Sequence, residues 1–187
     1  MEERTMEEAY AAFCAGDKVA FDEIMRKFQQ GLIYFLQGYV HSFETAEDLA
    51  EDTFVDLLLH PGRFRGQSSL KTYLFSVARH KAIDHIRHEQ RHPAVGLEEV
   101  AERRDDTMGP EERLLAAEHA QEIEAVLETL PEEYREVLRL LHLERFTYEE
   151  TARVMKKSRK QIDNMAYRAR SALRAALGKE GIVYEGL

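Results

Sequence analysis

The sequence gathers its basic side chains into two stretches that could bind the phosphates of a nucleic acid. Residues 63–92 contain 7 Lys or Arg against 2 Asp or Glu, and residues 153–174 contain 8 against 1. Acidic stretches at 1–62 and 93–136 bring the net charge of the chain to −9. Phosphate binding depends on the local field rather than on the total charge. The pattern therefore predicts that one chain contacts a polyanion at two places.

The second basic stretch has the pattern of a helix-turn-helix. Thr147 with Glu150 and Ser158 with Gln161 form two capping boxes, so two helices begin about eleven residues apart. In such a motif the second helix enters the major groove by its N-terminal end. A solvated basic helix in a bundle would have the same charge pattern. The residues that this helix would bury recur at helical spacing and are Ile162, Ala166, Ala169 and Leu173.

The opposite face of that helix carries the side chains that could contact duplex DNA. Lys160, Gln161 and Asn164 project from its first turns and suit base edges, whereas Arg159 and Arg168 suit phosphates. An acidic side chain on this face could accept a hydrogen bond from a cytosine amino group. The full candidate set is Arg159, Lys160, Gln161, Asp163, Asn164, Tyr167 and Arg168.

Composition and apolar spacing favour an all-α fold that positions these residues. Ala, Leu, Glu and Arg are plentiful, whereas Val, Ile and Thr are few. Apolar residues at helical spacing predict helices over about 17–40, 45–60 and 69–88, which would form one bundle. Pro, Gly and dense charges after residue 92 favour a linker. A second helical unit follows it, with Pro131 in the first turn of a helix and an apolar stripe behind it.

Each predicted helix of the first bundle has a candidate cap and an apolar face. Asp17 opens the first helix, Ser42 or Thr45 the second, and Ser68 or Ser69 the third. The second helix would bury Ala46, Leu49, Ala50, Thr53, Phe54 and Leu57. The third would bury Leu70, Leu74, Val77, Ala78 and Ala82.

Other function classes lack their motifs in this sequence. The single Cys14 cannot form an internal disulfide, and the acidic N-terminus has no signal-peptide core, so we expect a cytoplasmic protein. The longest apolar run, 32–40, is too short to cross a membrane. Without a phosphate loop, nucleophile elbow or Cys–His zinc pattern, we expect no enzyme and no cofactor. Four possible metal ligands follow one another at steps of four residues: His80, Asp84, His88 and His92. Because side chains along one straight helix cannot surround a single ion, we expect no metal site here.

The order of motifs resembles a bacterial RNA polymerase sigma factor of the small, two-domain, extracytoplasmic-function (ECF) type. The resemblance rests on AEDLAEDTF (46–54), GRFRGQSSLKTYLFSVARHKAIDHIR (62–87), LPEEYREVLRLLHLERFTYEETARVM (130–155) and YRARSAL (167–173). It implies a domain at 1–91 that binds core polymerase and melts the minus-ten promoter element. It also implies an acidic flexible linker at 92–111 and a helix-turn-helix domain at 112–187 that binds the minus-thirty-five element.

The resemblance further assigns site residues to the first domain. Polymerase binding is implied for an acidic helix face made of Glu47, Asp48, Glu51 and Asp52. Like charges one turn apart weaken an isolated helix slightly, although many such faces are only solvated. Strand opening is implied for Arg65, Gln67, Ser68, Lys71, Tyr73, Arg79 and Asp84. Cations suit phosphates and an aromatic ring suits a stacked base, but Tyr73 could equally pack in the core.

The partners implied by the resemblance are core RNA polymerase, promoter DNA and an anti-sigma factor, with no membrane insertion. The alternative is a stand-alone helix-turn-helix regulator whose first domain serves dimerisation or sensing. Such a regulator binds duplex DNA unaided, usually as a dimer on a palindrome. A sigma factor, in contrast, should bind promoters well only together with core enzyme.

Overall fold

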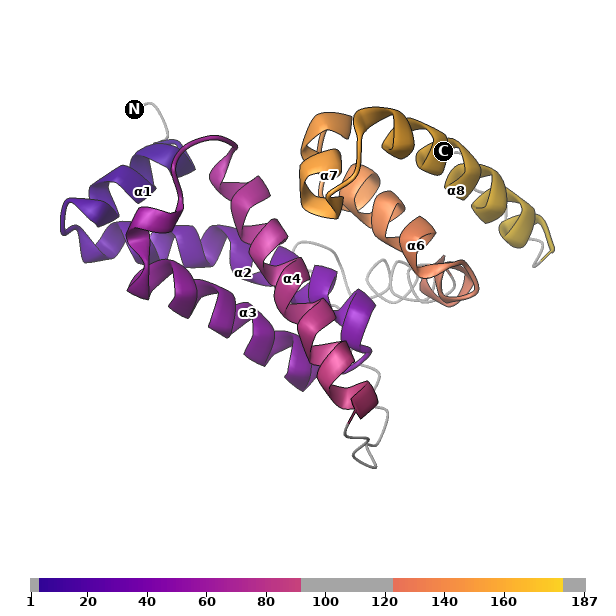
Figure 1. The fold of residues 1–187 in the computed structure, drawn as a ribbon, viewed down its shortest axis with the longest axis horizontal. Helices are drawn as coiled ribbons and strands as arrows, with labels where there is room; N and C mark the ends of the chain where they lie inside the picture. Colours follow the sequence, from indigo (N-terminus) through magenta and orange to yellow (C-terminus); the bar gives the residue numbers. More distant parts are fainter. Residues whose placement is uncertain (1–3, 92–122, 180–187) are drawn as a thin grey trace, which may run out of the picture.

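The computed structural model describes residues 4–91 and 123–179, and every regular element in these ranges is helical. The first unit contains α1 (Met6–Cys14), α2 (Lys18–Val40), α3 (Phe43–Leu59), the short turn η1 (Pro61–Arg63) and α4 (Leu70–Arg91). The second contains α6 (Glu132–Leu138), the π-helical turn η2 (Arg139–Leu143), α7 (Tyr148–Met155) and α8 (Arg159–Lys179) (Figure 1). The all-α prediction is thus confirmed, and the linker predicted at 92–111 lies outside the described residues.

Side-chain caps fix where the helices of the first unit begin. The carboxylate of Asp17 accepts hydrogen bonds from two backbone amides of α2, as predicted. Ser42, rather than Thr45, caps α3, and Ser69, rather than Ser68, accepts from the amide of the first turn of α4. α4 continues to Arg91, beyond its predicted end. No described helix is both long enough and apolar enough to cross a lipid bilayer.

α1 is an element that the apolar spacing above does not predict. Its signal is a capping box: Thr5 accepts from the amide of Glu8, and the Glu8 carboxylate accepts from the amide of Thr5. Tyr10 of α1 meets the ring of Phe64 edge-on at 5.0 Å and donates its hydroxyl to the carbonyl of Pro61. These contacts fasten α1 to the loop that leads into α4.

The core of the first unit follows the predicted faces of α3 and most of α4. All six residues predicted for α3 are buried. On α4 four of the five predicted residues are buried, while Val77 is only partly buried. Phe75 and Thr72 are buried as well: Phe75 packs between Phe35 of α2 and Phe146 of the second unit, and Thr72 donates to Glu150 of the second unit. That extra burial has no counterpart in the periodicity of α4 alone.

The second unit forms the predicted helix-turn-helix. α8 buries the four predicted residues, and both capping boxes are present. Lys156 ends α7 in the left-handed region at φ 53°, which turns the chain sharply toward α8. Pro131 is the cap residue before α6 rather than part of its first turn, because its backbone is extended. The turn at Lys156 fixes the angle between α7 and α8.

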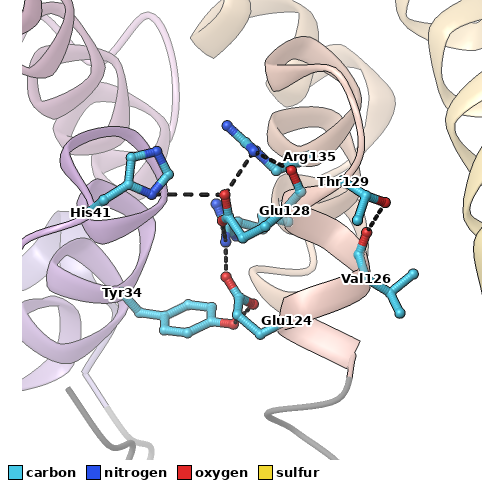
Figure 2. Close-up of polar contacts among 8 residues, drawn as sticks. Tyr34, His41, Glu124, Val126, Glu128, Thr129 and Arg135 are labelled. Carbon is cyan, nitrogen blue, oxygen red and sulfur yellow. Dashed lines mark hydrogen bonds and ion pairs between the residues drawn. The ribbon is translucent and has the colours of Figure 1, made fainter. Parts of the chain in front are cut away.

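The two units pack against each other along α4. α7 lies beside α4, and α6 approaches α2 (Figure 1). Near the end of α2, Tyr34 donates to Glu124 at 3.0 Å and His41 lies 3.8 Å from Glu128 (Figure 2). Arg139 pairs with both glutamates, and a Cβ at Gly38 would collide with its guanidinium. A larger residue at this position would therefore force the Arg139 side chain to shift.

Candidate nucleic-acid interface

α8 presents the predicted polar face to solvent. It runs along the outer side of the second unit, away from α4 (Figure 1). Its N-terminal turn follows directly on the tight turn at Lys156, and the first three residues of the helix are exposed. A helix N-terminus in this position can enter a major groove without first displacing another element. All seven predicted residues are exposed: Arg159, Lys160, Gln161, Asp163, Asn164, Tyr167 and Arg168.

Some side chains on this face are held in place by ion pairs or hydrogen bonds with neighbouring residues, and others are not. Arg159 lies 3.4 Å from Glu149 and 3.6 Å from Asp163, with its guanidinium 4.7 Å from the ring centroid of Tyr148. The side-chain oxygen of Gln161 accepts from the backbone amide of its cap residue at 2.8 Å. The cap therefore uses one lone pair of this oxygen and fixes the direction of the side chain, so Gln161 cannot turn freely toward a base unless the cap breaks.

Two of the predicted base-reading residues are not held in this way. Within the described residues, Lys160 and Asn164 make no side-chain hydrogen bond or ion pair. Lys160 offers donors to guanine, whereas Asn164 can bond an adenine edge through two atoms. The structure therefore favours these two side chains over Gln161 for reading bases.

The acidic face of α3 is also open. Asp48, Glu51 and Asp52 are exposed and Glu47 is partly exposed. Within the described residues none of the four has an ion-pair partner, whereas Asp56 nearby pairs with Arg63 at 2.6 Å. This face can therefore attract a cationic partner.

The same face continues as an apolar patch that the sequence analysis missed. Val55, Leu58 and Leu59 are exposed by 47%, 45% and 65%. Their signal was spacing, because Val55 and Leu59 follow Asp48 at i+7 and i+11 on one helix face. Exposed apolar side chains beside a charged face are typical of a protein-binding surface. We call the acidic and apolar residues together the α3 face.

The residues predicted for strand opening do not form one open surface. Arg65 and Gln67 are exposed in the loop before α4, and Ser68 is partly buried there. Asp84 is exposed and lies 3.1 Å from His80 and 3.6 Å from Arg87. It thus lies beside an imidazole and a guanidinium group on the solvent side of α4. Lys71, Tyr73 and Arg79 are each partly buried.

Tyr73 belongs partly to the core. Its ring packs against Phe64 at a centroid distance of 5.3 Å, and Phe64 in turn meets Tyr10 of α1. Burial, and to a lesser degree the nearby Asp56 carboxylate, raises the pKa of its hydroxyl. One part of the ring supports the loop before α4, while the rest stays accessible to a stacked base.

Lys71 and Arg79 point into the second unit. The Nζ of Lys71 lies 3.2 Å from the Glu144 carboxylate. Nε and Nη2 of Arg79 donate to both oxygens of Glu136, at 2.6 and 3.2 Å. These two predicted DNA contacts are therefore occupied by acidic side chains of the same chain.

The histidines of α4 make local pairs. His80 lies beside Asp84, and His85 lies 3.4 Å from Glu89. Across 4–91 and 123–179 no three His, Cys, Asp or Glu side chains converge into a group that could hold a metal ion. His92, the last of the four histidine and aspartate positions considered above, lies outside the described residues.

Comparison with known proteins matches both units in order. The family model described as "Sigma-70 region 2" matches residues 24–92, and the one described as "Sigma-70, region 4" matches residues 120–173. The RNA polymerase sigma-H factor of Pseudomonas aeruginosa is 30% identical over 171 residues, which span 87% of this chain and 88% of that protein. The ECF RNA polymerase sigma factor ShbA of Streptomyces griseus is 37% identical over 133 residues, 69% of this chain and 70% of that protein.

The fold is also similar to a solved structure. The sigma factor RpoE of Bartonella quintana, crystallised with the anti-sigma factor NepR, superposes with a TM-score of 0.68 at 23% identity. The match covers 84% of this chain and 96% of that one. The order of the two matched regions, the open recognition helix and the identity to these relatives lead to one assignment: the chain belongs to the ECF type of RNA polymerase sigma factors.

Proposed function

We propose that this chain binds core RNA polymerase, directs it to specific promoters and assists strand opening at the start of transcription. The observation that carries the proposal is that the α3 face and the DNA-reading face of α8 are both exposed, one on each unit. A single chain can therefore hold a cationic protein surface and duplex DNA at the same time. That double contact is what recruiting polymerase to a promoter requires.

The α3 face is the proposed polymerase contact. Glu47, Asp48, Glu51 and Asp52 supply charge for a basic partner, and the adjoining Val55 and Leu59 supply apolar area. Charge complementarity speeds association, and burial of the apolar side chains then stabilises the complex. Residues 44–60 contain no Lys or Arg, so nothing basic on α3 opposes such a partner.

The exposed face of α8 is the proposed contact with the minus-thirty-five element. Lys160 and Asn164 reach base edges, and Arg168 contacts phosphate. Arg159 is held by Glu149 and Asp163 in a fixed position near the start of the helix. Tyr167, exposed by 70%, offers further contact area.

Strand opening at the minus-ten element is proposed for the loop before α4 and the helix itself. Arg65, Gln67 and Ser68 line the loop, and Tyr73 lies at its base. A polar loop beside an aromatic ring suits an unstacked base. Lys71 lies at the start of α4, and Arg79 and Asp84 lie farther along it. The two cations would follow the phosphates of the separated strand.

Further parts of the proposal concern location, catalysis and regulation. We propose a non-catalytic protein that acts in the cytoplasm, where promoters and polymerase are found. An anti-sigma factor is a proposed partner, since the RpoE structure above contains one. The stand-alone regulator is not favoured, because the matched regions span both units rather than the helix-turn-helix alone.

A binding experiment with and without core enzyme tests this function. The purified chain, core polymerase and their mixture are each incubated with sheared genomic DNA, and the retained fragments are sequenced. We expect enrichment of fragments that share two spaced elements only in the mixture. Palindromic fragments retained by the chain alone would instead identify a stand-alone regulator. Core polymerase alone is the control for fragments that it retains without the chain.

A further inference from the structure

Lys71, Phe75 and Arg79 recur every four residues and form one stripe along α4, here called the α4 stripe. Every member contacts the second unit. Lys71 lies 3.2 Å from the carboxylate of Glu144, and its ammonium lies 4.6 Å from the ring centroid of Phe146. Phe75 packs edge-on against the same Phe146 ring at 5.1 Å. Because Arg79 pairs with Glu136 of α6, the stripe is covered along its length by α6 and by the segment that leads into α7.

The contact of Arg79 is the more buried of the two ionic contacts. Its two hydrogen bonds reach both oxygens of Glu136, and the side chains are only 16% and 3% exposed. Two parallel bonds fix the mutual orientation of the groups as well as their distance. If one partner were removed, the other would remain as an uncompensated buried charge. The pair can therefore separate only when the two units part and water reaches both groups.

Polar contacts at the beginning of α4 close the same interface. The hydroxyls of Ser69 and Thr72 donate to the carboxylate of Glu150 at 3.2 and 3.3 Å. Arg153 of α7 donates to the carbonyl of Gln67 at 3.2 Å. Glu150 also caps α7, so one side chain both starts that helix and fastens it to α4. The interface thus reaches into the loop proposed to hold the separated strand.

We propose that this interface is an autoinhibitory closed state, in which the second unit covers the cations that would hold the separated promoter strand. The inference rests on the proposed function, which assigns Lys71 and Arg79 to DNA. Neither can contact a phosphate while it pairs with Glu144 or Glu136. The α3 face and the outer face of α8 stay exposed in the same state. Polymerase and duplex DNA can therefore be bound first, whereas strand capture requires the second unit to leave α4.

The closed state has a measurable consequence for binding of single-stranded DNA by the free chain. Apparent affinity falls in proportion to the fraction of molecules that are open. A chain that is open about one tenth of the time would bind about tenfold more tightly once the interface is broken. The size of this gain measures how firmly the interface is closed.

The test variant is Glu136→Gln, which removes the charge opposite Arg79 but alters no residue assigned to DNA. Its matched control is Glu133→Gln, which removes the same charge from the same helix. Glu133 is exposed and pairs with Lys157 within the second unit. The probe is a fluorescent oligomer of about 20 thymidines, slightly longer than one single-strand binding site. Circular dichroism verifies that both variants keep their helices.

Closure itself is measured with a carbodiimide. When an amine and a carboxylate are already in contact, this reagent joins them through an amide bond, with loss of water. Lys71 and Glu144 should be joined in the free parent chain, because their charged atoms are 3.2 Å apart. Lys157 and Glu133 are 2.7 Å apart within one unit and report cross-linking that is independent of closure. Mass spectrometry of the peptides gives both yields in the parent, where both pairs are intact. Glu136→Gln should lose only the first cross-link.

We expect Glu136→Gln to bind the oligomer about tenfold more tightly than the parent, and Glu133→Gln to stay within about twofold. A folded Glu136→Gln that binds no more tightly would overturn the proposal, as would a parent without the Lys71–Glu144 cross-link. Failure of the proposed function would give a different result. If Glu136→Gln opens and gains affinity but neither protein directs core enzyme to promoters, the closed state stands and the sigma activity does not.

Discussion

On α8 the basic side chains point into solvent, whereas on α4 Lys71 and Arg79 point into acidic residues of the other unit. Lys160 and Arg168 are exposed, and within the described residues they make no ion pair. The two surfaces were predicted from similar concentrations of Lys and Arg in the sequence. Their difference shows that composition can predict a DNA contact, while the packing of the two units decides whether that side chain is exposed.

The largest expected effect is on the free energy of unfolding, and it should distinguish a buried aromatic residue from an exposed one. Phe146 is 5% exposed and packs on Phe75, whereas Tyr167 is 70% exposed on α8. Phe146→Ala should lower the free energy of unfolding by about 3–5 kcal/mol, because it leaves a cavity between the units. Tyr167→Ala should change it by less than about 0.5 kcal/mol. Urea denaturation measures both, and equal losses would contradict the contrast between the surfaces.

Charge reversal on the α3 face should remove polymerase without disturbing either basic surface. In Asp48→Lys/Asp52→Lys the repulsion within α3 is relieved, so the free chain should be no less stable. Binding to core should weaken by about 3 kcal/mol, since like charges then face each other. A pull-down with core enzyme and a thermal melt give the two results. A stable variant that binds core as tightly as the parent would leave the α3 face merely solvated.

On α8 itself, a free side chain should differ from one that caps the helix. Lys160→Ala should reduce discrimination at one base pair by about 1–3 kcal/mol and leave stability unchanged. Gln161→Ala should act mainly on stability, by about 0.5–1 kcal/mol, because Gln161 accepts from the amide of Ser158. Run-off transcription on a set of minus-thirty-five variants, together with thermal melts, distinguishes them. Equal loss of discrimination in both would return Gln161 to the base-reading group.

The smallest expected effect is a pH dependence at the edge of the interface. Burial raises the pKa of Glu150, but hydrogen bonds from Thr147, Ser69 and Thr72 outweigh it, so the pKa lies below its ordinary value of 4.5. A carboxyl group with a lowered pKa stabilises the fold above its unfolded pKa and loses that contribution as pH falls through the folded pKa. Below pH 4.5 the melting temperature of the parent should fall faster than that of Glu150→Gln. Parallel curves would exclude the contribution.

Local features of the sequence, namely apolar spacing and capping boxes, predicted most of the helices in each unit. Apolar spacing predicted the buried faces of α3 and α8, and both capping boxes of the helix-turn-helix are formed as predicted. These features depend on residues within about one turn of each other, so a single stretch of sequence contains all the information. The capping box of Thr5 and Glu8 was equally local, and α1 could have been predicted from it.

The interface between the units had no such signal. Glu136 and Arg139 are buried, and charged residues are seldom buried unless they have a partner. The partner of Glu136 is distant in sequence, because Arg79 is 57 residues away and lies in the other unit. Spacing within α6 gives no sign of that pairing. The burial of Phe75 was missed in part for the same reason, because its ring packs on Phe146 of the other unit as well as on Phe35 of α2.

The contrast between the two basic surfaces is tested most directly by lysine acetylation of the free chain, followed by mass spectrometry. Lys160 is exposed without an ion-pair partner in the described residues, whereas Lys71 is held between Glu144 and Phe146. We predict that Lys160 reacts roughly tenfold faster than Lys71, because Lys71 reacts only in the open fraction. In Glu136→Gln the two rates should converge. Equal rates in the parent would show that α4 is as open as α8 and would contradict the account.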